Sequence, residues 1–505
     1  MTSIHRDGGP VPPPDSFNMA AHVLGRAGQL ADKTALAIVS PARATRWRYG
    51  ALAQAVEGIA AGLMESGLQP GDRLLMRLGN EVEFPLAYLG AIWAGIVPIP
   101  ASAALTVPEI SRIAAETRPA AIIAAPDISL PEGSDVPVLP ALALREMETC
   151  PPAPPAMGDP NRPAYIVYTS GTSGQPRGVV HAHRAIWARQ MMWRDWYDLH
   201  EDDRLLHAGA FNWTFTLGTG LMDPWAIGAT ALIPADGVSP AQLPLLLRRH
   251  DATLFAAAPG VYRQMLREHP ALDLPKLRHG LAAGERLPDA TRKAWHAATG
   301  RVVHEALGMS EVSTYLSGSP GRPAPEGTSG YPQRGRRLAV LDGDGAPVAR
   351  GTPGTLAVHR SDPGLMLEYL DAPGDTAARY RGEWFVTGDT VVMAADGAIS
   401  FLGRDDDMMN AGGYRVSPLE VEAVLATHPD ISEIACAEIE VKADTRVIGA
   451  FYTSAVPLDA QALEIFAAER LARYKCPRIF TRLPTLPRAG NGKIDRKSLR
   501  RAPPA

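Results

Sequence analysis

The stretch that decides the fold runs Tyr168-Thr-Ser-Gly-Thr-Ser-Gly-Gln-Pro-Arg-Gly178 and follows the apolar residues Tyr165, Ile166 and Val167. Its glycines can take positive φ, which lets the backbone come close to a ligand. Its hydroxyls and amides can donate to phosphoryl oxygens, and Arg177 adds a cation. A Gly/Ser-rich linker is the alternative, but linkers seldom follow a buried strand. The stretch therefore predicts a phosphate-binding loop, which is not a Walker A loop because the Gly-Lys-Ser/Thr ending is missing.

The composition is that of a globular protein with more than one domain. The chain has 505 residues, 46% hydrophobic and 21% charged, which is too long for one ordinary core. Its net charge of −4 gives no reason to expect nucleic acid or an anionic membrane as a partner. Cys150, Cys436 and Cys476 are widely spaced, and the N-terminus lacks the pattern of a secretory signal. We therefore expect reduced thiols in a cytoplasmic protein.

Helical and strand-like hydrophobic patterns alternate over most of the chain. The expected helices are 49–68, 107–116, 241–250 and 260–269, and the expected strands are 73–76, 120–125, 230–233 and 254–258. Such alternation predicts α/β layers with mainly parallel strands. The uncharged segment 84–108 is divided by Pro98 and Pro100, so we expect a buried core helix and no membrane insertion. The proline-rich residues 126–163 predict a surface connection.

The pattern changes after about residue 403. A polar turn is followed by segments that predict a helix at 418–427, strands at 434–440 and 445–453, and a helix at 459–473. We therefore predict a large N-terminal α/β domain of layered sheets and helices, residues 1–403. A small, mobile α+β C-terminal domain would comprise residues 404–505.

The phosphate loop resembles the signature of the adenylate-forming superfamily, which includes acyl-CoA and aryl-CoA synthetases, amino-acid adenylation domains and beetle luciferases. The family's loop usually ends in Pro-Lys-Gly, whereas this chain has Arg177 in place of the lysine and keeps the charge in a planar fork. The resemblance implies that the loop binds ATP, with Thr172 in a catalytic role. The implied loop contacts are Thr169, Ser170, Gly171, Thr172, Ser173, Gly174 and Arg177.

Two further motifs follow in the family's order. Gly284-Glu285 is similar to the strand-to-helix turn that lines the adenine and acyl pockets in relatives. The segment Leu307-Gly308-Met309-Ser310-Glu311 resembles the family's aromatic-Gly-x-Thr-Glu, with Leu307 in place of the ring that often covers adenine. The resemblance assigns Leu307, Gly308 and Ser310 to the nucleotide. It assigns Glu311 to Mg²⁺, which usually takes one or two protein carboxylates when bound with ATP.

The later motifs concern the ribose, the hinge and the second substrate. Asp389 in Thr-Gly-Asp and the following Arg404 match the residues that bind the ribose in relatives. Asp406, within three consecutive aspartates, occupies the family's hinge position, although a solvated turn is also expected there. The resemblance places Gly412 and Gly413 at the pantetheine tunnel and identifies Lys493 as the catalytic lysine, whose charge would stabilise the adenylation transition state.

The motifs together predict an ATP-dependent acid-thiol ligase that forms an acyl-adenylate and then an acyl-CoA thioester, releasing AMP and pyrophosphate. Phe211 is followed by Asn212, whereas amino-acid adenylating modules have an aspartate there for the substrate amine. The alternatives are a stand-alone adenylation enzyme that loads a carrier protein, a luciferase-like oxygenase, and a non-catalytic adenylate-binding protein. A homodimer is one assembly compatible with the sequence.

The acyl pocket predicted by resemblance is apolar, with large rings. Its principal residues are Phe211, Trp213, Ala258, Gly260 and Met309. Such a wall suits a flat aryl or alicyclic acid, or a short to medium acyl chain. Local runs such as Tyr474-Lys475-Cys476-Pro477 are similar to those of benzoate-CoA ligases and favour an aromatic acid. The expected small molecules are thus a carboxylic acid, ATP with Mg²⁺, and coenzyme A.

Overall fold

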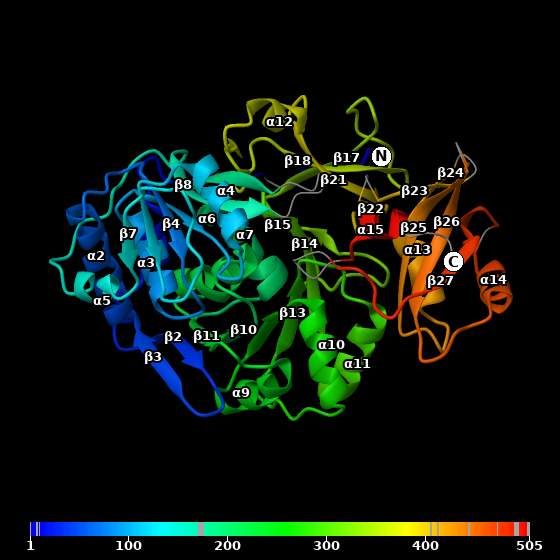
Figure 1. The fold of residues 1–505 in the computed structure, drawn as a ribbon, viewed down its shortest axis with the longest axis horizontal. Coiled ribbons are helices and arrows are strands. Elements are labelled where there is room, and N and C mark those ends of the chain that lie inside the picture. The colour runs from blue at the N-terminus through cyan, green and yellow to red at the C-terminus, as the bar shows by residue number, and fades with distance from the viewer. Residues whose placement is uncertain are drawn as a thin grey trace.

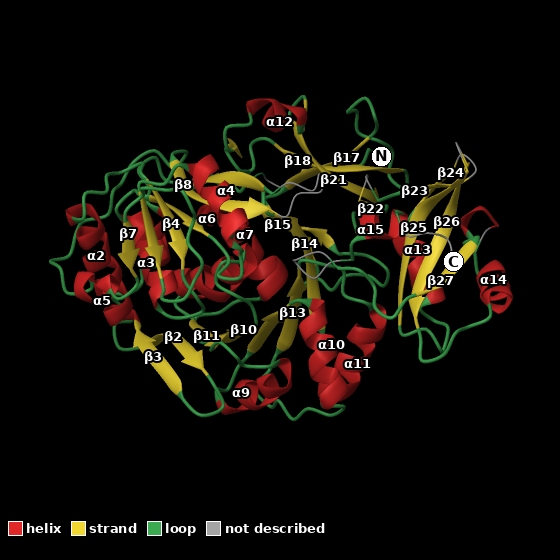
Figure 2. Cartoon of the chain, in the orientation of Figure 1, coloured by secondary structure: helices red, strands yellow, loops and turns green. Residues whose placement is uncertain are grey.

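A computed structural model describes most of the chain. The described residues are 2–6, 9, 11–169, 176–404, 407–411, 414–442, 445–471, 473–488 and 494–501. A large N-terminal α/β domain, coloured blue to yellow in Figure 1, lies beside a small C-terminal α+β domain coloured orange to red. Figure 2 shows helices packed against the strands in both parts, and in the large domain residues of α1 (Met19–Val23), α2 (Tyr49–Glu65) and α3 (Glu83–Trp93) share one core with strands of two different sheets.

A nine-stranded sheet forms the middle of the large domain. In spatial order its strands are β16 (Tyr331–Pro332), β15 (Ser313–Ser317), β14 (Val303–Met309), β13 (His279–Ala283), β12 (Leu254–Ala257), β10 (Arg204–His207), β11 (Thr230–Pro234), β2 (Thr34–Val39) and β3 (Ala44–Arg48). The strands from β14 to β2 are parallel, as predicted, while β15, β16 and β3 run antiparallel to their neighbours.

Both faces of this sheet are covered, because alternate residues of a strand point to opposite sides. Phe255 and Ala257 of β12 pack with one layer of helices, and Leu254 and Ala256 pack with another. The first layer comprises α9 (Leu243–Arg249), α10 (Pro259–Glu268) and α11 (Asp289–Thr299). The second layer includes two π-helices, η1 (Trp193–Tyr197) and η2 (Thr216–Met222).

A four-stranded parallel sheet lies in the N-terminal part of the chain. Its order is β5 (Val97–Pro100), β4 (Arg73–Arg77), β6 (Ala121–Ala124) and β7 (Val138–Pro140). The helices of this region are α1 (Met19–Val23), α2 (Tyr49–Glu65), α3 (Glu83–Trp93), α4 (Val107–Thr117) and α5 (Ala143–Met147). The two parts of the segment 84–108 are thus a buried helix and a strand, and no described helix is long and apolar enough to cross a bilayer.

Antiparallel strands complete the large domain. One sheet is β1 (Ile4–Arg6), β17 (Arg337–Leu341), β18 (Pro353–His359), β21 (Trp384–Met393) and β20 (Tyr380–Arg381), with β22 (Ile399–Arg404) also paired to β21. Another is β19 (Glu368–Tyr369), β9 (Arg177–Ala182) and β8 (Pro163–Thr169). The remaining elements are α6 (Ala185–Ala188), α7 (Gln190–Met192), α8 (Asp223–Ile227), η3 (Pro240–Gln242) and α12 (Pro373–Ala378).

The small domain has its own core. Its strands are β23 (Met409–Ala411), β24 (Tyr414–Val416), β25 (Glu433–Lys442), β26 (Thr445–Thr453) and β27 (Ile479–Arg482). Its helices are α13 (Pro418–Leu425), α14 (Ala460–Ala468), η4 (Arg473–Lys475) and α15 (Arg496–Arg500). Val421, Cys436, Ile448 and Ala467 are buried together, so helices and strands share one core, as an α+β domain requires.

The sequence located most of these elements and was wrong about one region. The helix predicted at 49–68 is α2, and the strand predicted at 445–453 is β26. Residues 126–163 are not a plain surface connection, because they contain β7 and α5. Leu144 of α5 is fully buried in the core beside α2, and hydrophobic anchoring of this kind was hidden by the surrounding prolines.

Candidate active site

The predicted site residues converge on a large cleft to which both domains contribute. Its volume is about 1690 Å³. The sequence-predicted residues that line it are Thr169, Arg177, Trp213, Gly284, Glu285, Leu307, Gly308, Met309, Ser310, Glu311, Asp389 and Arg404. From the small domain come residues of α13 and of the segment 494–498. Outside the described residues lie Ser170, Gly171, Thr172, Ser173, Gly174, Asp406, Gly412, Gly413 and Lys493.

A buried carboxylate lies where β21 and β22 pair. Asp389 and Arg404 are opposite each other in the ladder, and the Arg404 Nη1 donates to Asp389 Oδ1 at 2.8 Å. The Tyr315 hydroxyl donates to the other carboxylate oxygen at 3.2 Å. Burial raises the pKa of the Asp389 carboxyl, and the Arg404 charge opposes that rise. Asp389 lines the cleft, and a carboxylate with two acceptor oxygens suits two neighbouring hydroxyl groups.

The ends of the predicted phosphate loop are held by an antiparallel pair of strands. Thr169 of β8 and Arg177 of β9 are register partners, so both are fixed where the loop leaves and rejoins the hairpin. The Arg177 Nη2 lies 2.9 Å from Asp375 Oδ2, and its guanidinium carbon lies 5.3 Å from the centroid of the Tyr369 ring. The arrangement keeps a cation at the border of the cleft.

Tyr369 connects this cation to Glu311. Its hydroxyl donates to Glu311 Oε1 at 2.7 Å, and Glu311 is only 8% exposed. Burial and the nearby Glu311 charge raise the pKa of the Tyr369 hydroxyl, which therefore keeps its proton at neutral pH. Glu311 lies in the turn between β14 and β15, not in a solvated helix start. Its carboxylate is thus a fixed, hard oxygen ligand of the kind that Mg²⁺ accepts alongside phosphate oxygens.

His181 of β9 supports the same turn. Its Nε2 lies 2.7 Å from the backbone oxygen of Ser310, and its ring stacks on Tyr165 at a centroid distance of 4.9 Å. Burial lowers the pKa of His181 to about 4, so the imidazole is neutral at pH 7 and its Nε2 proton can be donated to the Ser310 carbonyl. The contact fixes the residue directly before Glu311.

The turn after β13 requires a glycine. Gly284 has a φ of 94°, and a Cβ built there would lie 2.9 Å from Cζ2 of Trp213. The Trp213 ring therefore approaches the backbone at Gly284, and it also meets Phe215 edge-on at a centroid distance of 5.0 Å. Both rings line the cleft, as does Leu307. Trp213 thus lies on the wall that the sequence assigned to the acyl group.

Three residues that the resemblance assigned to the acyl pocket do not line this cleft, so their role in binding the acid stays a prediction. Phe211 is 1% exposed and stacks on Phe84 with ring centroids 5.6 Å apart, so it belongs to the core. Ala258 and Gly260 also lie off the wall, at the start of α10, which packs on the sheet. Met309 does line it.

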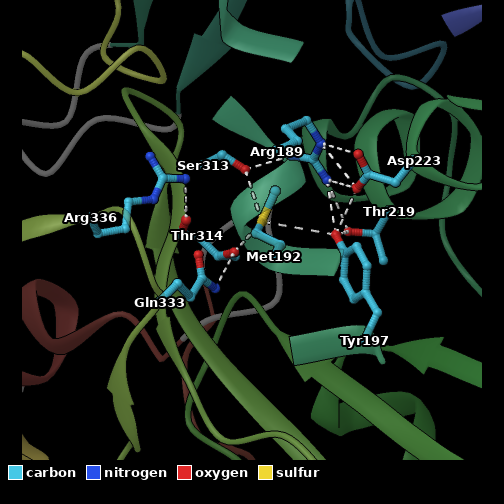
Figure 3. Close-up of polar contacts among 9 residues, drawn as sticks. All are labelled: Arg189, Met192, Tyr197, Thr219, Asp223, Ser313, Thr314, Gln333 and Arg336. Carbon is cyan, nitrogen blue, oxygen red and sulfur yellow. Dashed lines mark hydrogen bonds and ion pairs between the residues drawn. The ribbon is translucent and has the colours of Figure 1, made fainter. Parts of the chain in front are cut away.

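The wall of the cleft is not wholly apolar, contrary to what the sequence predicted for the acyl pocket, because it includes a charged and hydrogen-bonded group of side chains. Arg189 and Asp223 form a bidentate ion pair, with Arg189 Nε 2.9 Å from Asp223 Oδ1 and Nη2 2.6 Å from Oδ2. The Tyr197 hydroxyl donates to Asp223 Oδ2 at 2.8 Å, and the Arg189 Nη1 donates to Ser313 Oγ at 2.6 Å (Figure 3). Arg189, Thr219 and Ser313 line the cleft. We call these five residues, Arg189, Tyr197, Thr219, Asp223 and Ser313, the polar cluster.

The sequence reasoning missed both Tyr369 and the polar cluster. Arg189 and Asp223 are 34 positions apart, and Tyr369 and Glu311 are 58 apart. A usable signal was present for the first pair, because Asp223 is the one charged residue in the run from Thr216 to Ile227. A lone acid in such a run needs a buried partner.

Comparisons with known proteins define the family. The AMP-binding enzyme model matches residues 25–370, and the AMP-binding enzyme C-terminal domain model matches residues 420–493. The chain therefore belongs to the AMP-binding enzyme family.

Named relatives cover nearly the whole chain. A benzoate–CoA ligase of Thauera aromatica is 31% identical, with 97% of each chain covered. A 3-hydroxybenzoate–CoA ligase of Aromatoleum sp. is 28% identical and covers 96% of this chain and 97% of its own. The solved structure of a benzoate CoA ligase from Burkholderia xenovorans LB400 has a TM-score of 0.86 at 28% identity, covering 96% of this chain and 100% of its own.

Proposed function

We propose that the protein is an ATP-dependent acid–CoA ligase. It converts an aromatic or other small hydrophobic carboxylic acid into its CoA thioester and releases AMP and pyrophosphate. The observation that carries this proposal is the convergence of Glu311, Asp389 and Arg404 on one cleft. Family membership and full-length similarity to benzoate–CoA ligases support the same chemistry.

In the first half-reaction, a carboxylate oxygen of the acid attacks the α-phosphorus of ATP. A bond forms between that oxygen and phosphorus, the bond to the bridging oxygen breaks, and pyrophosphate leaves. Asp389 and Arg404 would hold the ribose, and Arg177 with the loop 169–178 would hold the phosphates. Lys493 would stabilise the charge that builds on the phosphoryl oxygens in the transition state.

In the second half-reaction, the thiol of coenzyme A, having lost its proton, attacks the carbonyl carbon of the acyl-adenylate. The carbon–oxygen bond to AMP breaks, and AMP departs with an oxygen that came from the acid. We propose that the small domain turns about Asp406 between the two steps, so that Lys493 withdraws and Gly412 and Gly413 face the pantetheine.

The finer assignments belong to the same proposal. The Tyr369 hydroxyl holds the Glu311 carboxylate in place, and that carboxylate would bind Mg²⁺. The ion would neutralise phosphate charge when bound. We propose that the domain boundary lies between residues 403 and 404. We also propose that the protein is cytoplasmic and that it can form a homodimer.

The test is pyrophosphate release with MgATP across aryl, alicyclic, short-chain and medium-chain acids and amino acids. Each acid is supplied with and without CoA, and the thioester is identified by mass. We expect a CoA-stimulated product from at least one aryl or alicyclic acid, lost in Glu311→Gln and kept in Glu326→Gln, a matched change at an exposed glutamate. Pyrophosphate release without any thioester would instead favour loading of a carrier protein, and no release with any acid would favour adenylate binding without turnover.

A further inference from the structure

The polar cluster is built into the acyl side of the cleft. Ser313 is the register partner of Met309 across the β14–β15 turn, and Met309 lines the cleft and is one of the residues that the resemblance assigns to the acyl pocket. Thr219 belongs to η2, which begins directly after the wall residue Phe215. The cluster therefore lies beside the space that the body of the acid would occupy.

Unusual backbone holds the cluster in place. Tyr197 ends one π-helix and Thr219 lies within another, and π-helical turns are rare and frequent at functional sites. Ser313 has a φ of 77°, which a residue with a side chain seldom adopts. A Cβ at Gly218 would lie 2.2 Å from Cζ of Arg189, so the guanidinium packs directly on bare backbone. Strain of this kind persists where the surrounding structure fixes it, often at ligand sites.

The net charge of the cluster is zero. Arg189 is 8% exposed and Asp223 is fully buried, and the bidentate contact balances their charges. The Tyr197 hydroxyl stays protonated, because burial and the Asp223 charge raise its pKa well above the usual value. A second carboxylate on the substrate would therefore meet no uncompensated cation here, and its desolvation would not be offset.

Ser313 retains a proton that it can donate into the cleft. Its oxygen accepts the Arg189 Nη1 proton at 2.6 Å, so its own hydroxyl proton must point elsewhere. The acceptor recorded for that proton among the described residues is the Met192 sulfur at 4.0 Å, a weak one (Figure 3). A hydroxyl that accepts a bond from a cation is also a stronger donor.

We propose that the acid activated by this enzyme carries a neutral oxygen substituent, a hydroxyl or carbonyl group, away from its reacting carboxylate, and that Ser313 recognises it with the support of Arg189. The inference rests on the proposed ligase function and narrows its substrate class. Ser313 would be a specificity residue that touches the substrate, and Arg189 and Asp223 would be positioning residues that act through it. An unsubstituted ring would leave the Ser313 hydroxyl without a good acceptor, which selects against such acids.

The test compares kcat/KM for matched acids that differ by one group. The pairs are benzoate with 3- and 4-hydroxybenzoate, and cyclohexanecarboxylate with its hydroxyl and oxo derivatives. We expect at least one oxygen-bearing acid to exceed its parent by about tenfold, the discrimination that one additional hydrogen bond supplies. Terephthalate, which adds a second carboxylate, should be the poorest of the panel.

Ser313→Gly is the decisive variant, because it removes the hydroxyl together with its one carbon and glycine accepts a positive φ without strain. It should reduce the preference for the oxygen-bearing acid about tenfold, mainly through a fall in kcat/KM for that acid. The control is Ser361→Ala, which changes an exposed serine and should leave both values unchanged. Replacing the ion pair in Arg189→Met/Asp223→Leu should abolish the same preference, and it leaves no unpaired buried charge that could prevent folding.

The outcomes separate the two proposals. Turnover of parent acids without preference for oxygen-bearing ones, or equal loss for both acids in Ser313→Gly, would overturn the substrate inference and leave the ligase function standing. A preference for terephthalate would also overturn it. Calorimetry with the matched acyl-sulfamoyl adenosine analogues gives a readout without turnover. The wild-type protein should bind the oxygen-bearing analogue about tenfold more tightly than the parent analogue, and Ser313→Gly should bind the two analogues with equal affinity. Absence of turnover with every acid would refute the ligase function and the inference with it.

Discussion

Replacing Asp389 by asparagine removes one charge while keeping the shape of the side chain. In the wild-type protein both carboxylate oxygens accept hydrogen bonds, from Arg404 at 2.8 Å and from Tyr315 at 3.2 Å. An asparagine oxygen can still accept from Arg404, and its amide can donate to the Tyr315 oxygen, so the fold should be kept. The amide group, however, can accept from only one of the two ribose hydroxyls.

The expected loss follows from that missing bond. A hydrogen bond to a charged group contributes about 1.5–3 kcal/mol. At about 1.4 kcal/mol per factor of ten, the KM for ATP should rise about 10- to 150-fold. The increase should be the same for every acid tested, because the ribose is common to all of them.

The assay is acid-dependent pyrophosphate release at varied ATP, with three different acids. Asp344→Asn provides the matched control, since Asp344 is exposed in a turn of the same domain. Thermal unfolding of each variant shows that the fold is intact. An unchanged KM for ATP, or a change seen with only one acid, would remove Asp389 from the ribose and refute the assignment.

Three further predictions follow from other contacts. Tyr369→Phe removes the hydroxyl that holds Glu311, so the Mg²⁺ concentration for half-maximal activity should rise several-fold at saturating ATP; an unchanged magnesium titration would separate Glu311 from the metal. Lys493→Ala should reduce pyrophosphate release by at least a hundredfold and spare thioester formation from supplied acyl-adenylate, and equal losses in both half-reactions would contradict its role. Burial raises the pKa of Glu305 to about 7 against the opposing charge of Arg292, so the folded protein binds the proton more tightly than the unfolded chain. The stability that this proton provides is present below about pH 4.5 and is lost as pH rises to 7. In urea unfolding, the free energy of unfolding of the wild-type protein should fall by roughly 1–3 kcal/mol over that range relative to Glu305→Gln. Parallel plots of unfolding free energy against pH for the two proteins would refute this.

Local patterns in the sequence were sufficient for much of the fold. Helix α2 and strand β26 were predicted because hydrophobic periodicity marks the buried face of each element. The cleft residues Glu311, Asp389 and Arg404 were found because their motifs stand in a recognisable order along the chain. The structure adds how they are held, which depends on partners that no motif contains.

The remaining features depend on contacts between distant residues. Phe211 was assigned to the acyl pocket by resemblance to the family, whereas its stacking on Phe84 is set by packing between two separate segments. Arg189 precedes β10 in the sequence and Asp223 follows it, and only the folded structure brings the two side chains within 2.6 Å of each other. Neither contact leaves a periodic signal, so single-sequence reasoning could not pair them.

The central claim, that the protein activates an acid through its adenylate, is tested most directly with a carboxylic acid labelled with ¹⁸O in its carboxyl group. After turnover with MgATP and CoA, the AMP is analysed by mass. If the acid oxygen attacks the α-phosphorus, AMP carries one labelled oxygen and pyrophosphate carries none. Label in inorganic phosphate or pyrophosphate, or unlabelled AMP alongside thioester, would contradict the acyl-adenylate route.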